Sequence, residues 1–192
     1  MIPFNREIEV KIDASSITEA SFCRWMKTLK PFTQLLVIGP DEFFSRGNET
    51  IRHRMPPGEP SQLTIKKRRS RRSITDRSEV DLELASVDPQ LVRDFLVLAG
   101  FKLTLKLHKR ARIFWFRKGK EEVVVSYYTA QKTGKPSSTR SFIEIEIAKG
   151  SALTIKEAKQ TLIRWIAEIN SNFDVKASPL NYSLFEIFTK ER

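Results

Sequence analysis

Two short segments near opposite ends of the chain carry carboxylates at alternating positions. The first is REIEVKID at 6–13 and the second is FIEIEI at 142–147. Successive side chains of a strand point to opposite faces, so the acidic residues of each segment share one face and the apolar residues share the other. Those acidic residues are Glu7, Glu9, Glu144 and Glu146. Alone, either segment is typical of an antiparallel strand whose charged face lies in water.

Basic residues follow the same alternation in the segments between these two. The expected strand at 50–55 places Arg52 and Arg54 on one face, and the one at 62–67 places Lys66 beside Thr64. The remaining charged positions at this spacing are Lys11, Arg77, Glu79, Asp81, His108, Arg110 and Arg112. Acids and bases on so many strands indicate that the charged faces meet across a shared interior.

A shared interior of this kind needs partners for its charges, because isolated buried charge is very costly. A divalent cation with a polyanion would satisfy both sets of side chains. Carboxylate oxygens are hard ligands that suit Mg²⁺ or Mn²⁺, and Arg and Lys hold phosphate oxygens in fixed geometry. The pattern therefore predicts a triphosphate site. The alternatives are an open sheet that is wet on one face and a polyanion-binding module without catalysis.

The hydrophobic pattern predicts about eight strands and three or four helices in a single α+β domain over 1–192. Helices are expected from Ser15 or Ser16 to Leu29, from Asp88 to Ala99, and from Thr154 to Ile169. A further short helix is expected within 178–188, and a loop over 129–141. The strands can form an open sheet or a closed antiparallel barrel with a charged lumen and helices packed outside.

Composition narrows the class of partner. The 192 residues carry a formal net charge of +11, which favours nucleic acid, nucleotides, polyphosphate or an anionic surface. A basic run at 66–72 is a candidate RNA contact. The lone cysteine, Cys23, excludes a disulfide framework and favours a reducing, intracellular compartment, with the cytoplasm expected. No segment is apolar enough for a signal peptide or a membrane span, so no membrane partner is expected. Nothing in the sequence specifies an oligomeric state.

The chain resembles the triphosphate tunnel metalloenzymes, the superfamily that includes CYTH domains. The resemblance begins with E-x-E-x-K at Glu7, Glu9 and Lys11 and runs through the chain in family order. The other matching segments are 41–44, IRHR at 51–54, LTIK at 63–66, RSEVD at 77–81, Arg110 with Arg112, FIEIE at 142–146 and NYSLF at 181–185. One departure is that Ser126 or Tyr127 stands where the family commonly has an aspartate.

The resemblance implies a closed barrel of about eight strands and metal-dependent hydrolysis of a triphosphate. Glu7, Glu9, Glu144 and Glu146 would bind Mg²⁺ or Mn²⁺, and Glu7, Glu9, Glu79 and Asp81 would act in catalysis. The residues implied to bind the triphosphate are Lys11, Arg52, Arg54, Lys66, Arg77, Arg110 and Arg112.

The H-x-R-x-R segment at 108–112 is similar to a strand of the RNA triphosphatases of capping systems. The first expectation for the substrate is therefore the 5′-triphosphate end of RNA. Inorganic, thiamine or nucleoside triphosphates are alternatives, as is cyclisation of ATP by a class IV adenylyl cyclase.

Overall fold

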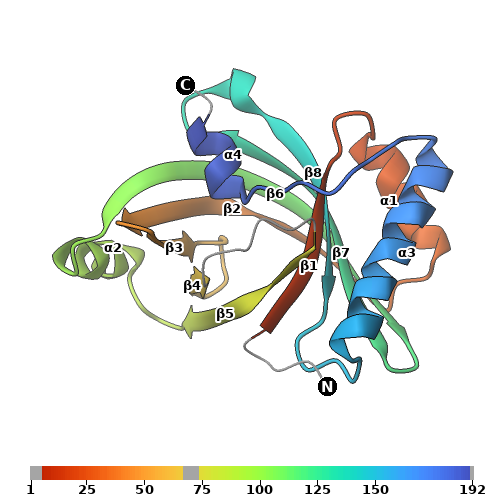
Figure 1. Ribbon diagram of the computed structural model, residues 1–192. Coiled ribbons are helices and arrows are strands. Elements are labelled where there is room, and N and C mark those ends of the chain that lie inside the picture. Colours follow the sequence, from red (N-terminus) through yellow and green to blue (C-terminus); the bar gives the residue numbers. More distant parts are fainter. Residues whose placement is uncertain (1–5, 67–73, 191–192) are drawn as a thin grey trace.

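The computed structural model describes residues 6–66 and 74–190. Eight antiparallel strands close into a barrel in the order β1-β5-β4-β3-β2-β6-β7-β8 (Figure 1). The strands are β1 Arg6–Asp13, β2 Thr33–Arg46, β3 Glu49–Arg54, β4 Ser61–Lys66, β5 Thr75–Leu84, β6 Lys102–Lys118, β7 Glu121–Lys132 and β8 Arg140–Ile147. The α-helices of the described residues are α1 Glu19–Thr28, α2 Pro89–Leu98, α3 Ile155–Phe173 and α4 Leu184–Lys190. The predicted α+β barrel with helices outside is confirmed.

The two acidic strands meet where the barrel closes. β1 pairs with β5 on one side and with β8 on the other, although β8 lies near the other end of the chain. In the β1–β8 register Glu9 lies opposite Glu146, and Lys11 lies opposite Glu144. Closure of the sheet therefore brings the two predicted carboxylate segments side by side.

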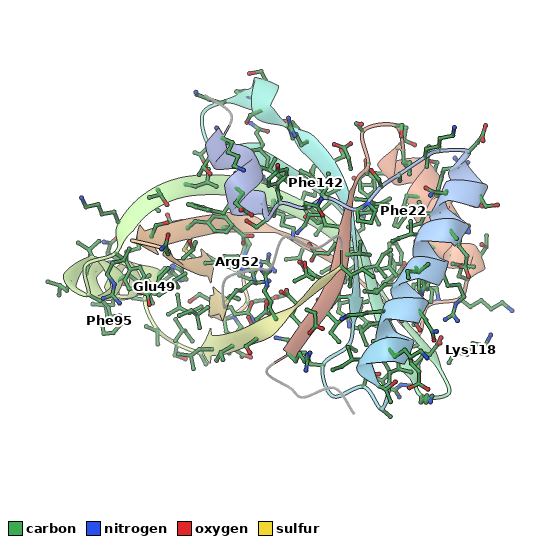
Figure 2. All side chains as sticks on the ribbon, viewed as in Figure 1. Phe22, Glu49, Arg52, Phe95, Lys118 and Phe142 are labelled. Atoms are coloured by element: carbon green, nitrogen blue, oxygen red, sulfur yellow. The ribbon has the colours of Figure 1, made fainter. Side chains whose placement is uncertain are left out.

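The main hydrophobic core lies outside the barrel, under α1 and α3 (Figure 1). Ile8, Val10 and Ile12 of β1 are fully buried there, together with the isoleucines of β8. Phe22 of α1 packs into the same cluster (Figure 2). Because the apolar faces of β1 and β8 turn toward these helices, their acidic faces turn into the lumen.

Two smaller helices cover other parts of the barrel. Asp88 caps α2, and buried Val92 and Leu96 pack against Phe44 of β2. Helix α4 packs at one end of the barrel, where Phe185 contacts the ring of Phe43 at 5.9 Å between centroids. The predicted helix at the C-terminal end is thus confirmed and lies against side chains of the barrel interior.

Local boundaries differ from the prediction at three places. Helix α1 is capped by Thr18, whose hydroxyl accepts from the backbone N–H of Ser21, and Ser15 and Ser16 precede it in a turn. Strand β7 continues to Lys132, so the loop predicted to begin at residue 129 is shorter. Helix α3 has the expected capping box at Thr154 and Glu157 but continues past Ile169 to Phe173. Helix α1 therefore begins later than predicted, whereas β7 and α3 continue further than local signals indicated.

In the part of the chain that the structure describes, no helix combines the length and apolar character needed to cross a membrane. Of the basic run at 66–72, only Lys66 lies within the described residues.

Candidate functional site

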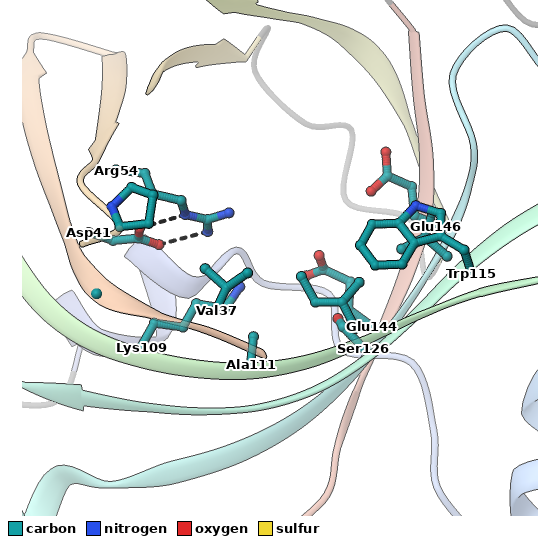
Figure 3. A pocket seen from close by; sticks show the side chains of 13 residues that line it. Val37, Asp41, Arg54, Lys109, Ala111, Trp115, Ser126, Glu144 and Glu146 are labelled. Atoms are coloured by element: carbon teal, nitrogen blue, oxygen red, sulfur yellow. Dashed lines mark hydrogen bonds and ion pairs between the residues drawn. The ribbon is translucent and has the colours of Figure 1, made fainter. Parts of the chain in front are cut away.

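Carboxylates from β1 and β8 line one wall of the lumen. Glu7 and Glu9 are almost completely buried, with 2% and 3% of their surface exposed. Figure 3 shows Glu144 and Glu146 directed into the pocket from β8, the strand that pairs with β1. Burial, followed by the charges of Glu7 and Glu9, raises the pKa of Glu146 well above its ordinary value. This position thus favours the neutral, protonated form of Glu146.

Two of these carboxylates are engaged by basic side chains. Glu7 pairs with Lys66 and accepts from the Nε of Arg77 at 2.6 Å. Glu144 pairs with Lys11 at 2.9 Å. Burial alone would raise the pKa of Glu144, but the charges of Lys11 and Lys109 outweigh it and lower that pKa below its usual range. Among the described residues, by contrast, no hydrogen bond or ion pair reaches the carboxyl of Glu146.

The basic residues line a cavity of about 400 Å³ in the same lumen. Its cationic lining consists of Lys11, Arg52, Lys66, Arg77 and Lys109. Arg52 lies inside the barrel (Figure 2) and donates from Nη2 to Thr64 Oγ1 at 2.8 Å, while its buried Nε has no partner among the described residues. Five basic side chains around one cavity suit a compact polyanion in their chemistry.

Arg54 also reaches the lumen, but it is held by a protein carboxylate. Its Nε and Nη2 donate to the two oxygens of Asp41 at 2.8 and 2.9 Å (Figure 3). Burial opposes ionisation of Asp41, and the charge of Arg54 outweighs it, so the pKa of Asp41 falls well below its usual range. This bidentate pair fixes Arg54 in place at the edge of the pocket.

The remaining predicted acids, Glu79 and Asp81, lie on β5 and are bridged by Lys149. Lys149 Nζ is 2.7 Å from Glu79 Oε1 and also contacts Asp81. Asp81 accepts from Thr64 Oγ1 at 2.6 Å, and Lys66 links Glu79 to Glu7. Both acids therefore belong to the network of the lumen. Lys149 lies in the turn after β8. Strand alternation identified the other charged residues of the lumen, but it could not identify a residue in a turn.

The structure does not bring Arg110 and Arg112 to the lumen. Both lie on the outer face of β6 and pair with Glu19 of α1, at 3.0 Å for Arg112. The residues of β6 that face the pocket are Lys109, Ala111, Ile113 and Trp115. The prediction of their face was wrong because β6 carries its apolar residues inside and its regular row of charges outside. Lys109 is the cation that this strand supplies to the lumen.

Other lumen residues were missed for similar reasons. Tyr128 of β7 donates to Glu144 at 3.4 Å, and the Nζ of Lys109 lies 3.8 Å from the centre of the Tyr128 ring. Burial and the charge of Arg54 lower the pKa of Lys109 to about 7. Ser126 or Tyr127 of β7 was expected at the position where the tunnel metalloenzymes commonly have an aspartate. Ser126 faces the pocket, and Tyr127 packs into the outer core.

The residues suit a hard divalent cation in their chemistry. Glu9 and Glu146 lie opposite each other, and burial, followed by the charges of neighbouring carboxylates, raises the pKa of both. Over residues 6–66 and 74–190, however, no three acidic, histidine or cysteine side chains converge closely enough to hold a metal as placed. The pairing of Glu7 and Glu144 with lysine and arginine accounts for this, since those carboxylates turn toward cations.

Comparison with known proteins identifies the fold. The PH1819 protein of Pyrococcus horikoshii OT3 is 19% identical with a TM-score of 0.66, covering 97% of this chain and 99% of that chain. The protein Pfu-838710-001 of Pyrococcus furiosus is 18% identical with a TM-score of 0.67, over 94% and 98% of the two chains. A candidate adenylate cyclase of Bacillus halodurans is 13% identical with a TM-score of 0.55, over 96% and 98%. No family model and no curated protein matches the sequence. The chain thus shares a whole-length barrel fold with these proteins.

Proposed function

We propose that this chain is a metal-dependent triphosphatase of the triphosphate tunnel type. The observation that carries the proposal is that one lumen has a carboxylate wall on β1 and β8 and basic side chains that include Arg52, Lys66 and Arg77. A triphosphate with its divalent cation presents the complementary charges. The fold shared with a candidate adenylate cyclase supports phosphoryl chemistry in the same architecture.

Ligand binding would exchange partners within the lumen. Phosphate oxygens would take the hydrogen bonds of Lys11, Arg52, Lys66 and Arg77, and Glu7 and Glu144 would be released from their ion pairs. Glu7, Glu9, Glu144 and Glu146 would then hold Mg²⁺ or Mn²⁺. The bound cation would supply charge neutralisation on the phosphate oxygens. Without ligand, the acidic and basic side chains of the lumen would pair with each other. With ligand, the acidic side chains would pair with the cation and the basic ones with the phosphates.

Hydrolysis requires little covalent chemistry from the protein. Water attacks the γ-phosphorus in line, the bond to the bridging oxygen breaks, and the cationic side chains stabilise the negative charge that is redistributed. Glu79 or Asp81 would orient this water, because both belong to the lumen network, Glu79 through Lys66 and Lys149 and Asp81 through Lys149 and Thr64. Arg54 already donates two hydrogen bonds to Asp41, so any contact that it makes with the substrate would be next to that carboxylate.

The 5′ end of RNA stays one candidate substrate, with inorganic, thiamine and nucleoside triphosphates as the others. The similarity of the segment at 108–112 to RNA triphosphatases was the reason for preferring RNA. Arg110 and Arg112 of this segment lie outside the barrel, so that similarity does not extend to the lumen. Cyclisation of ATP is the second candidate activity, favoured by the adenylate cyclase neighbour.

Phosphate release from tripolyphosphate, ATP and triphosphate-ended RNA, with Mg²⁺ or Mn²⁺ and with a chelator, tests the proposal. Glu9→Gln or Glu146→Gln should lower turnover by about 100-fold or more, since each removes a cation ligand. The control is Glu59→Gln, at an exposed position outside the lumen. Turnover that persists in chelator, or that survives both lumen variants, contradicts the proposal. Cyclic AMP formed from ATP in place of phosphate would identify the cyclase.

A further inference from the structure

The lumen contains a second region whose chemistry differs from the charged walls. A pocket of about 250 Å³ is bounded by apolar side chains of three neighbouring strands, β2, β6 and β7. These side chains are Val37, Ala111, Ile113, Trp115 and Val124. Inorganic phosphate gains nothing from such a wall, because its oxygens need charged or hydrogen-bonding partners. The composition therefore indicates a ligand group that is not phosphate.

Trp115 gives this wall a flat aromatic surface. The other two tryptophans of the chain, Trp25 and Trp165, pack against each other in the outer core at 6.3 Å between ring centroids. In the described part of the chain, no aromatic ring packs against Trp115, and its side chain lies at the pocket beside Glu146 (Figure 3). A partly buried indole without a ring partner, facing a cavity, is suited to stack on a planar group.

The apolar pocket adjoins the cationic cavity. Lys109 and Glu144 line both of them, so the two cavities meet at these two side chains. The side of the pocket facing the cations carries the Asp41–Arg54 pair, and the other side carries Trp115 (Figure 3). A chain of phosphates held by Arg52, Lys66 and Arg77 would thus direct whatever it is attached to toward the indole.

Backbone packing shapes the pocket on the side of β2. A Cβ atom at Gly39 would lie 2.8 Å from the backbone oxygen of Met55 and 3.0 Å from Cα of Pro56. Glycine at this position therefore lets the turn after β3 approach β2 and places Pro56 in the pocket lining. The pocket is a built feature of the fold, closed by a contact that a larger residue would prevent.

We propose that this pocket binds a planar aromatic heterocycle attached to the triphosphate, so that the substrate is an organic triphosphate of the nucleotide class. The inference rests on the proposed function and specifies its substrate. The volume is sufficient, since an apolar cavity of roughly 150 Å³ holds a benzene ring in another protein. Ser126, which also lines the pocket, supplies a hydroxyl that would hydrogen-bond to the ring.

The test compares ATP with tripolyphosphate in the wild type, Trp115→Ala and Trp115→Phe. Both ligands share the triphosphate, so their ratio of kcat/KM isolates the contribution of the ring. Trp115→Ala should lower the ratio for ATP over tripolyphosphate by about 5- to 100-fold, as expected for one lost stacking contact. Trp115→Phe, which keeps an aromatic face, should recover most of the ratio. Far-ultraviolet circular dichroism checks that each variant folds.

Equilibrium binding of the same two ligands, measured by calorimetry, separates this inference from the proposed function. If the wild type hydrolyses neither ligand, the proposed function fails, and the ratio of dissociation constants still decides the inference. A ratio that is the same in the wild type and Trp115→Ala overturns it. Should Trp115→Ala not fold, Trp115→Phe and Ala111→Phe take its place. The latter fills the pocket and should lower the ratio, and an unchanged ratio in both overturns the inference.

Discussion

Glu9 and Glu146 lie directly opposite each other on the paired strands β1 and β8, and both belong to the acidic wall of the lumen. Glu9 has no close charge-assisted hydrogen bond, because the Nζ of Lys11 and the Nη2 of Arg77 stand 3.9 and 3.7 Å from its Oε1. Burial and the neighbouring carboxylates raise the pKa of both residues. The ligand-free site therefore favours the protonated form of these carboxyls, and a bound cation would favour their ionised form.

The raised pKa of Glu146 should appear in the pH dependence of stability. The pKa of Glu146 is raised in the folded protein above its ordinary value of 4.5, so the folded state holds a proton that the unfolded chain releases. The free energy of unfolding should therefore fall as pH rises above about 4.5, at up to about 1.4 kcal/mol per pH unit. Glu146→Gln should remove this contribution.

Urea denaturation of wild type and Glu146→Gln between about pH 4 and pH 8 measures the effect. The variant's advantage in stability should grow with pH and shrink when Mg²⁺ is added to both proteins. A constant difference across this range would show that Glu146 does not titrate as described.

Lys109 should take up a proton when a triphosphate binds. Burial and Arg54 lower its pKa to about 7, so near pH 8 most molecules carry it in the neutral form. A polyanion in the adjoining cavity favours the charged form and raises that pKa. Calorimetric binding of tripolyphosphate at pH 8 in buffers of different ionisation enthalpy should show uptake of up to about one proton. Lys109→Arg, which stays charged, should bind with the uptake reduced, and equal uptake in both proteins would point to another group.

Arg52 and the pair of outer arginines should respond differently to substitution. Arg52→Ala removes a cation from the cavity and should lower kcat/KM for the triphosphate by about 10- to 100-fold, the usual effect of losing a charge-assisted hydrogen bond. Arg110→Ala with Arg112→Ala should leave kcat/KM within about 2-fold, since these residues contact Glu19 of α1 on the outside. A large loss of turnover in the double variant would place the arginines in the substrate path.

The Asp41–Arg54 pair should contribute strongly to stability. Asp41 is 1% exposed, and Asp41→Ala leaves the Arg54 guanidinium without its bidentate partner in the barrel. We expect a loss of about 3 kcal/mol in the free energy of unfolding, typical of breaking a buried ion pair. Glu49→Ala is the matched control because its pair with Arg46 is more than half exposed, and it should cost less than about 1 kcal/mol. Denaturation midpoints with equal m values decide between them, and equal losses would contradict the argument.

Much of the barrel was predictable because alternation assigns each strand two faces. On β1 and β8 the apolar face is continuous isoleucine and valine, so the acidic face could only turn inward once helices were placed outside. Strand β6 follows the opposite arrangement, with Ala111 and Ile113 inside and Arg110 and Arg112 outside. Alternation alone does not say which face is the lumen, and the regular row of charges pointed to the wrong one.

Residues outside the strand pattern could not be inferred in this way. Lys149 reaches Glu79 and Asp81 only because the turn after β8 is brought to β5 by β1, which pairs with both strands. The Asp41–Arg54 pair likewise depends on the register of β2 with β3, in which these residues lie opposite each other. The Lys149 contacts follow from closure of the barrel, and the Asp41–Arg54 pair follows from the register of one hairpin, which strand alternation alone does not specify.

The pairing of β1 with β8 also has a consequence for the time course of folding. The first and last strands of the barrel must find each other across most of the chain, and contacts between such distant segments form slowly. The four carboxylates at that seam cannot assemble before the seam does. A partly folded chain with an open barrel would therefore have no metal site, and affinity for the cation would appear only with the final step that joins the two ends of the sheet.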